Sequence, residues 1–500
     1  MRRFSFPPSL GSRRSLLRAV AAGLATLTVL LILLVRLPAT AETARHYTEL
    51  KFPPAPEVRF PDYTRYQLDN GIIVYLVEDH ELPLVQGTAL FRTGDRLEPA
   101  DKVGLAEIMG EVMRTGGTRT HSADQLNQLL EQQAAAVETG VSTTSGSATF
   151  DALSEDLPQV FSLFAEVIRE PVFAQDKIDL AKTQRRGGIA RRNDDPDEIA
   201  SREFQKLVYG NTSPYARTLE YATLNNINRE DIVKFYQQYF RPSNMILGVI
   251  GDFDRKAIRS LIQSKFGNWQ PAKAQQPKLP TVSQAKVGGV FLVNQPQLTQ
   301  SYVQMGHLGG QLSNPDHAAL SVLNEVLGGF GRRLFNQVRS RQGLAYSVYG
   351  FWSPQYDYPG VFVAGGQTRS ETTVPFIKSV LQEIEQLRTQ PVSQAELTSA
   401  KDTVLNSFVF NFADPKQSLA RLMRYEYYGY PRDFIFQYRR GVEATTVADL
   451  QRVAQKHLKP EDIVTLVVGN AAAIRPPLTS LNAKTKVTPV DISIPEPASR

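Results

Sequence analysis

The side chains that could bind a metal ion in this 500-residue chain include six histidines and two glutamates one helical turn apart. There is no cysteine, which excludes disulfides, thiolate metal ligands and a cysteine nucleophile. Glu107 and Glu111 are four residues apart, and carboxylates at that spacing can hold a hard cation loosely, although they more often form a solvated face. None of the histidines pair at the spacing of ligands on one helix, so each is interpreted as a surface or loop residue: His46, His80, His121, His307, His317 and His457.

The two glutamates lie in a predicted helix over Gly104–Arg114. Glu107, Gly110 and Glu111 share its polar face. The opposite face is apolar at helical spacing and is formed by Leu105, Ile108, Met109, Val112 and Met113. The sequence therefore predicts a packed helix whose solvated face carries acids and a glycine.

A repeat of one helix and one strand divides the chain into two halves. Asp231–Pro242 and Asp449–Pro460 each begin with an acid, place apolar residues at helical spacing and end at a basic residue before proline. Each is followed by a short β-branched run ending in glycine, Met245–Gly251 and Ile463–Gly469. All matched positions differ by 218 residues, which predicts two homologous domains in tandem.

Within each half, strands precede helices, which predicts an α+β sandwich with a sheet covered by helices. In the first half we expect a hairpin over Arg65–Leu76, strands at Leu84–Phe91 and Val141–Phe150, and helices at Ala123–Gln133, Leu157–Ile168 and Gln175–Arg192. In the second half we expect strands at Gly289–Val293, Ser301–His307, Ala345–Trp352 and Gly360–Gly366, and a helix from Pro315. The domains are predicted at 55–268 and 288–475, with an extended linker at 269–287 and a loose tail at 476–500.

Residues 1–41 have the composition of an export signal. They contain six arginines, no acid, the apolar run 19–35 and a small-residue site at Ala39-Thr-Ala41. Removing them leaves 50 basic and 50 acidic residues, which takes away the electrostatic support for nucleic-acid binding. We expect a periplasmic or otherwise extracytoplasmic protein. Two alternatives stay open: a twin-arginine signal, suggested by Arg13-Arg14, and an uncleaved membrane anchor at 19–35.

Several short motifs resemble the pitrilysin/insulinase type of zinc peptidase, the inverzincins, and specifically the two-domain bacterial branch related to mitochondrial processing peptidase. The resemblance covers residues 58–470 and implies two LuxS/metallohydrolase-like domains. It is carried by Leu82-Pro-Leu-Val85, Gly104-Leu-Ala106, Asn193-Asp-Asp-Pro196, Tyr239-Phe-Arg-Pro242, Gly251-Asp252, Leu334-Phe-Asn-Gln-Val-Arg339 and Gly343-Leu-Ala-Tyr346.

The zinc motif of that family is erased in this chain. Active members carry His-x-x-Glu-His on the first helix, where the histidines bind zinc and the glutamate activates its water. The matching positions here are Glu107, Gly110 and Glu111. The resemblance places a third zinc ligand, a glutamate, at Gly187-Gly188. We therefore expect no metal in this chain.

One pair of functional residues matches the family. Its second domain contributes an arginine and a tyrosine, seven residues apart, that hold the substrate backbone and polarise the scissile carbonyl; Arg339 and Tyr346 match them. A permanently charged guanidinium and a phenol donor suit a developing oxyanion. The alternative is structural, with Tyr346 packed in a strand and Arg339 capping a helix.

The resemblance implies a non-catalytic or half-site subunit that acts on peptides with a zinc-bearing homologous partner. An extended peptide would add to a sheet edge, for which Ser142–Thr149 is the candidate, although an ordinary half-exposed strand explains that run equally well. One competing hypothesis is a structural or peptide-binding protein with no share in catalysis. A lone zinc peptidase with a rearranged site is another.

Overall fold

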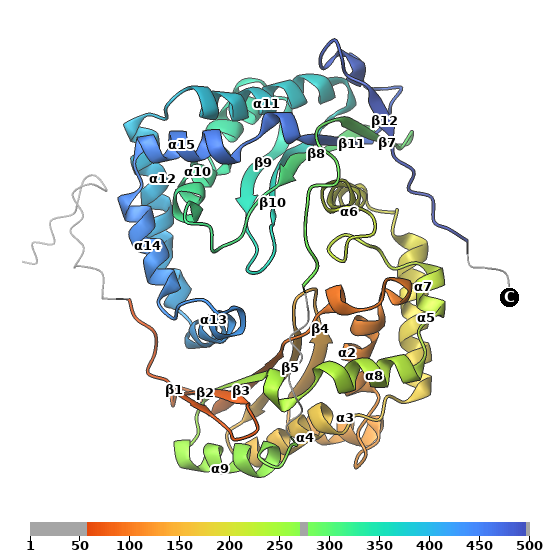
Figure 1. Cartoon of the computed structure of the whole chain (residues 1–500), viewed down its shortest axis with the longest axis vertical. Coiled ribbons are helices and arrows are strands. Elements are labelled where there is room, and N and C mark those ends of the chain that lie inside the picture. Colours follow the sequence, from red (N-terminus) through yellow and green to blue (C-terminus); the bar gives the residue numbers. More distant parts are fainter. Residues whose placement is uncertain (1–57, 271–278, 497–500) are drawn as a thin grey trace, which may run out of the picture. The chain divides into compact units, whose positions relative to one another are not determined.

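Two six-stranded sheets, each built from one half of the sequence, organise the protein (Figure 1). The structure is a computed structural model that describes residues 58–270 and 279–496. The first sheet has the order β1-β2-β6-β3-β5-β4, with strands Thr64–Gln67, Ile73–Glu78, Met245–Gly251, Leu84–Phe91, Gly146–Leu153 and Ala136–Val141. The second has the order β12-β7-β11-β8-β10-β9, with strands Val487–Pro489, Val290–Asn294, Val464–Gly469, Gln300–Leu308, Val361–Arg369 and Ala345–Ser353.

The predicted repeat is confirmed by the pairing of these strands. In each sheet the strand from the repeat, β6 or β11, lies parallel to one neighbour and antiparallel to the other. Every residue of both strands is buried, as expected for short β-branched runs in the middle of a sheet. The helices that precede them, α8 (Arg229–Tyr239) and α15 (Val447–His457), also match at an offset of 218 residues.

Helices of the same half cover one face of each sheet and form the main core of that half. In the first half these are α2 (Leu105–Thr115), α3 (Ala123–Gln132), α4 (Leu157–Arg169), α5 (Gln175–Arg191), α7 (Tyr221–Asn225), α8 and α9 (Arg255–Phe266). In the second half they are α10 (His317–Gly328), a π-helix η5 (Phe335–Arg341), α11 (Thr373–Thr389), α12 (Gln394–Ser407), α14 (Phe434–Ala444) and α15. Short 3₁₀ turns lie at Asp95–Leu97, Ala100–Lys102, Pro242–Asn244, Ser370–Thr372, Phe408–Phe412, Pro460–Asp462 and Leu478–Ser480.

Two helices are exchanged between the halves. Helix α6 (Pro196–Tyr209) belongs to the first half but packs on β8 and β11 of the second, through Ile199, Phe204 and Val208 among others. Helix α13 (Pro415–Tyr428) belongs to the second half but packs on β2 and β6 of the first. Its Leu419, Leu422 and Met423 meet Tyr75, Val77, Ile246 and Ile250.

The exchanged helices are themselves a repeat that the local signals explain. Each begins with an aspartate cap, Asp195 or Asp414, whose carboxylate accepts backbone N–H groups of the first turn, followed by proline at the first helical position. Each ends at a tyrosine before a glycine, Gly210 or Gly429, with positive φ. Because each helix buries its apolar face on the other half, the two halves share their cores.

The predicted strand over Val141–Phe150 is wrong in its extent. Strand β4 ends at Val141, β5 begins at Gly146, and Ser142–Ser145 is a turn in which the Ser145 N–H donates to Ser142 Oγ at 3.3 Å. The serine hydroxyl closes this turn without a proline or asparagine signal. Ser142–Thr149 is therefore not an edge strand, and the edge beyond β5 is formed by β4.

The C-terminal tail also differs from the expectation of a loose segment. Residues Val487–Pro489 form β12, which pairs in parallel with β7, and the Val490 N–H donates to the Leu292 carbonyl at 2.9 Å. This strand occupies the end of its sheet that β1 occupies in the first sheet, and it satisfies backbone groups that would otherwise form an open edge. In the linker, residues 279–287 have no helix or strand.

Residues 1–41, including the apolar run 19–35, lie outside the described residues. In the part of the chain that the structure describes, none of the helices combines the length and apolar character needed to cross a bilayer.

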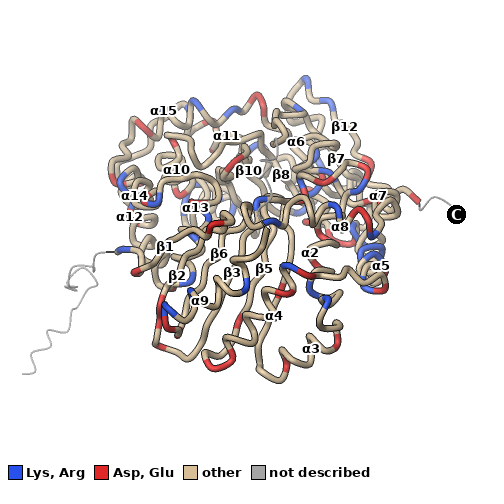
Figure 2. Tube along the Cα trace, turned by 60° about the horizontal axis from the view of Figure 1, so that its bottom comes forward, with Lys and Arg blue, Asp and Glu red and all other residues tan. Residues whose placement is uncertain are grey.

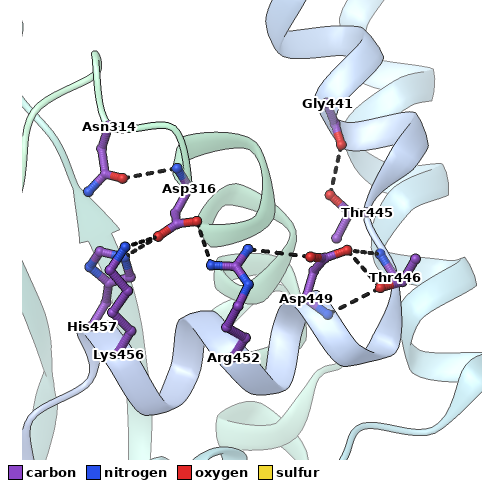
Figure 3. A network of polar contacts seen from close by, with 9 residues as sticks. All are labelled: Asn314, Asp316, Gly441, Thr445, Thr446, Asp449, Arg452, Lys456 and His457. Atoms are coloured by element: carbon purple, nitrogen blue, oxygen red, sulfur yellow. Dashed lines mark hydrogen bonds and ion pairs between the residues drawn. The ribbon is translucent and has the colours of Figure 1, made fainter.

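A buried aspartate ties α10 to α15 (Figure 3). The Asp316 carboxylate, 6% exposed, accepts hydrogen bonds from Arg452 Nη1 at 2.7 Å, Lys456 Nζ at 2.8 Å and His457 Nε2 at 2.7 Å. Burial opposes the negative charge, but these three donors hold the pKa of Asp316 well below its usual range. The cluster fixes the start of α10 against the helix of the second repeat.

Candidate functional site

The helix that carries the erased metal motif is α2, and its start is held by a buried glutamate. Glu98, 5% exposed, accepts the backbone N–H of Gly104 at 3.0 Å and of Ala106 at 2.9 Å. A carboxylate at a helix N-terminus satisfies free donors and interacts favourably with the helix dipole. The apolar face predicted for the helix is buried as expected, including Ile108, Met109 and Val112.

Arg185 of α5 links the carboxylates at the first and last motif positions. Its Nη1 lies 2.6 Å from Glu111 Oε2, and its Nε lies 3.8 Å from Glu107 Oε2. Helix α5 carries several basic residues (Figure 2), and one of them, Arg185, pairs with the acids of α2. The positive charge between these two acids is therefore a guanidinium of the same chain.

Gly110, at the position of the family's general base, is in close contact with an edge strand. A Cβ atom built on Gly110 would lie 2.8 Å from the Val141 nitrogen and 2.9 Å from the Gly140 carbonyl carbon, both in β4. Thr139 Oγ1 also donates to the Gly110 carbonyl at 2.6 Å. Since these are backbone atoms of β4, no larger side chain fits at position 110 unless the helix and strand separate.

Gly187, at the position of the family's third ligand, lies on α5 beside open space. A Cβ atom added at Gly187 or at the adjacent Gly188 would meet no other atom of the described residues within 4 Å. Neither glycine supplies a side-chain oxygen or nitrogen ligand. Among the residues described, no group of three or more His, Cys, Asp and Glu side chains is placed to hold a metal ion. The side chains present at Glu107, Gly110, Glu111 and Gly187 therefore do not fit a catalytic zinc ion.

Four of the described histidines have polar partners away from the motif, whereas His317, at the start of α10, stacks on Tyr438 with ring centroids 5.0 Å apart and its buried Nδ1 has no hydrogen-bond partner among the described residues. His307 is buried in β8, where its Nε2 accepts the Lys459 N–H at 3.1 Å, so the expectation that each histidine lies at the surface or in a loop is wrong for this residue. His80 pairs with Asp252, His121 with Glu166 and His457 with Asp316.

A polar cavity of about 410 Å³ adjoins the start of α2. Its lining includes Asp95, Glu98 and Glu107, together with Arg202 of α6 and Arg217. Burial, reinforced by the charge of Glu107, raises the pKa of Asp95 to about 6. Burial likewise raises the pKa of Glu98 to about 7, although its two backbone donors oppose the shift. Carboxyl groups with raised pKa in a cavity are typical of functional sites.

Arg339 and Tyr346, the pair that the resemblance singled out, lie side by side. Arg339 lies on the π-helix η5 and Tyr346 on β9, an edge strand of the second sheet. The guanidinium carbon of Arg339 is 4.9 Å from the centre of the Tyr346 ring and 4.7 Å from that of Phe335. Tyr346 is 83% exposed, and none of the described residues forms a hydrogen bond or ion pair with the Arg339 side chain. In the structural alternative Tyr346 packs in a strand and Arg339 caps a helix; Tyr346 does lie in β9 and Arg339 in the last turn of η5, but the Tyr346 ring is exposed.

Two family models match the sequence. The Insulinase (Peptidase family M16) model matches residues 74–222, and the Peptidase M16 inactive domain model matches residues 226–404. Together they span more than half of the chain. The chain belongs to peptidase family M16.

Some relatives of this M16 chain are named as zinc proteases, and one is named as a non-peptidase homolog. The non-peptidase homolog YmxG of Helicobacter pylori is 24% identical over 398 residues, 79% of this chain and 90% of the relative. The uncharacterized zinc protease YmxG of Bacillus subtilis is 24% identical over 365 residues, 71% of this chain and 86% of the relative. The crystal structure of a peptidase M16 inactive domain from Pseudomonas fluorescens has the same fold, with a TM-score of 0.74 at 24% identity over 83% of this chain and all of that one.

The sequence did not predict Arg185 as a partner of the two glutamates. Arg185 is 74 residues from Glu111 in the sequence. Helix α5 contains several basic residues, and its sequence does not indicate which of them faces α2.

Proposed function

We propose that this M16 homologue is a non-catalytic subunit that contributes Arg339 and Tyr346 to a peptidase site whose zinc is bound by a separate homologous chain. The observation that carries the proposal is the exposed Arg339–Tyr346 pair, whose guanidinium and phenol are held together without competing polar partners among the described residues. A π-helix is rare and is frequently found at functional sites, which supports a selected position for Arg339.

The state of the first half supports a division of labour. Arg185 pairs with Glu111 and approaches Glu107, and Gly110 has no room for a general base, so the described residues of this chain offer no place for the metal-bound water that peptide hydrolysis needs in this family. A guanidinium and a phenol alone can stabilise a developing oxyanion but cannot generate the nucleophile. Peptide hydrolysis would therefore require a zinc-bearing partner.

The test compares this chain, a homologous chain with an intact His-x-x-Glu-His motif, and their mixture in cleavage of an unfolded peptide. We expect hydrolysis by the mixture to exceed that of either chain alone. Arg339→Ala and Tyr346→Phe should each lower kcat about 100-fold, as loss of an oxyanion donor does, while the complex still forms by size-exclusion chromatography. Arg369→Ala removes an exposed guanidinium from the end of β10 and serves as the control.

The competing function, a structural or peptide-binding protein with no share in catalysis, gives a different result. In that case the mixture is active and both substitutions are silent, or no mixture shows activity beyond the partner alone. Zinc bound stoichiometrically by the isolated chain, with unaided cleavage, would contradict both proposals.

We also propose that residues 1–41 direct the chain out of the cytoplasm, on the basis of their arginines and the apolar run 19–35. An alkaline phosphatase reporter fused after residue 60 should be active in intact bacteria and inactive when 1–41 is deleted. Mass spectrometry of the purified chain distinguishes cleavage after Ala41 from retention as an anchor.

A further inference from the structure

A second polar cavity lies in the other half of the chain, beside the π-helix η5. Its volume is about 490 Å³, within the range of small-molecule sites. Residues of η5 form one side, and residues of α11 and α12 form the other. It shares no lining residue with the cavity at α2.

A buried carboxylate without a hydrogen-bond donor faces this cavity. Glu383 of α11 is 6% exposed and lines the cavity, and none of the described residues donates a hydrogen bond to it or forms an ion pair with it. Burial raises its pKa, against the attraction of Arg333 and Arg341. Its oxygens are not enclosed by protein but open to the cavity, so water or a ligand in the cavity supplies their hydrogen-bond donors.

Three arginines line the same cavity, and only one of them is paired with an acid. Arg333 forms two hydrogen bonds with Glu396, at 2.7 and 3.2 Å. Arg332 donates to Ser399 and Thr403, and Arg341 makes one long contact of 3.3 Å with Gln337. Arg332 and Arg341 thus line the cavity without a carboxylate partner among the described residues, and the remaining N–H groups of each guanidinium are available to an anion.

The carboxylate of Glu383 and the guanidinium groups of Arg332 and Arg341 would bind opposite charges, so one ligand that satisfies both must carry a positive and a negative group. A simple anion would match Arg332 and Arg341 but leave Glu383 without a donor. A simple cation would match Glu383 but would lie among three guanidinium groups. A carboxylate accepts bidentate hydrogen bonds from arginine, and an ammonium group supplies three donors to a carboxylate.

We propose that this cavity binds a small zwitterion, a free amino acid or short peptide, with its carboxylate at Arg332 and Arg341 and its ammonium group at Glu383. This site is separate from the Arg339–Tyr346 pair, and its occupancy does not depend on a partner chain or on peptide cleavage. The proposed ligand contacts Arg332 and Arg341 but not Arg339, whose guanidinium remains stacked on Tyr346.

The experiment titrates the purified full chain with triglycine, N-acetyl-triglycine and triglycine amide by isothermal calorimetry at pH 7. Triglycine should bind saturably, and the two blocked peptides, each lacking one charged group, should bind about tenfold more weakly. Absence of saturable triglycine binding up to 20 mM, about the weakest affinity that the method resolves, would overturn the proposal. Equal binding of the N-acetylated peptide would also overturn it, because the cavity would then be an anion site.

Variants assign the two ends of the ligand. Glu383→Gln keeps the shape of the side chain and should reduce triglycine binding about tenfold without affecting N-acetyl-triglycine. Arg341→Ala changes an exposed residue and should reduce triglycine binding to the level of the amide. The control is Glu385→Gln, on the same helix but paired with Arg388, which should bind triglycine as the unmodified chain does. If Glu383→Gln and Glu385→Gln bind triglycine equally well, Glu383 is not the ammonium site.

Discussion

Arg185 provides the positive charge beside the positions where active members of this metallopeptidase family bind zinc. Its guanidinium contacts Glu111 and approaches Glu107, so a base on α5 offsets part of the negative charge of two acids on α2. The sequence alone predicted that the metal ligands were missing, but it did not predict that Arg185 would pair with the acids at two of the motif positions.

Arg185→Ala should lower the free energy of unfolding by about 1 kcal/mol, because the lost ion pair is partly exposed and leaves two like charges one turn apart. Urea denaturation measures the change. Arg186→Ala removes a neighbouring guanidinium whose one hydrogen bond within the described residues goes to Asn225, and should alter stability by less. Equal effects of the two substitutions would mean that the pair with Glu111 contributes nothing.

Asp316→Asn should destabilise the second half by about 2 kcal/mol. Two of its three donors, Arg452 and Lys456, have side chains that are 50% and 57% exposed. The loss of stability should therefore be smaller than for a fully buried ion pair. Since the folded pKa of Asp316 is lowered, its contribution is present above the ordinary aspartate pKa and disappears as the pH falls through the folded value.

Thermal unfolding at pH 7 measures this effect, with Asp402→Asn, an exposed aspartate on α12, as the control. The difference between Asp316→Asn and the unmodified chain should shrink on moving from pH 7 to pH 3. A difference that grows on acidification would contradict the assigned sign.

At the scale of elements, local patterns predicted most helices and strands, because amphipathic spacing, proline stops and β-branched runs act over a few residues. The helix over Gly104–Arg114 and the repeated helix and strand agree with α2, α8, β6, α15 and β11. Two features were missed for physical reasons. A turn closed by a serine hydroxyl leaves a weak compositional signal, and β12 pairs with a strand almost 200 residues earlier.

The close contact of α2 with β4 makes two glycines a matched pair of tests. Gly110→Ala places a methyl group against the backbone of β4 and should destabilise the protein by about 2 kcal/mol, despite the better helix propensity of alanine. Gly187→Ala meets open space within α5 and should stabilise it by about 0.5–1 kcal/mol. Chemical denaturation of both variants measures the opposite signs. If Gly110→Ala is also stabilising, α2 and β4 are not in backbone contact.

At the scale of the molecule, contacts between the halves lay beyond the sequence patterns. The repeat predicted two similar domains but not that α6 and α13 would each cover the other half's sheet, because an amphipathic face does not specify which sheet covers it. The same holds for the Arg339–Tyr346 pair: its spacing was visible, whereas its exposure and stacking depend on how η5 meets β9.

A buried ion pair between Arg96 and Asp357 joins the two halves, and its removal should destabilise both of them. Arg96 forms two hydrogen bonds with Asp357, at 2.9 and 2.7 Å, and is 6% exposed. Asp357→Ala leaves that guanidinium buried without its counter-ion and should reduce the free energy of unfolding by about 3 kcal/mol. Glu371→Ala, which removes an acid from an exposed pair with Arg369, should change it by less than about 1 kcal/mol. Differential scanning calorimetry checks both values, and similar small losses would contradict a tight contact between the halves.

The exchange of α6 and α13 also has a consequence for biosynthesis. While the chain emerges from the ribosome, the apolar face formed by Tyr75, Val77 and Ile246 stays uncovered until Leu419 has been translated. At bacterial elongation rates this interval lasts roughly ten to thirty seconds. We expect the nascent first half to expose this apolar sheet surface throughout that time, which is the kind of surface that chaperones of unfinished polypeptides bind.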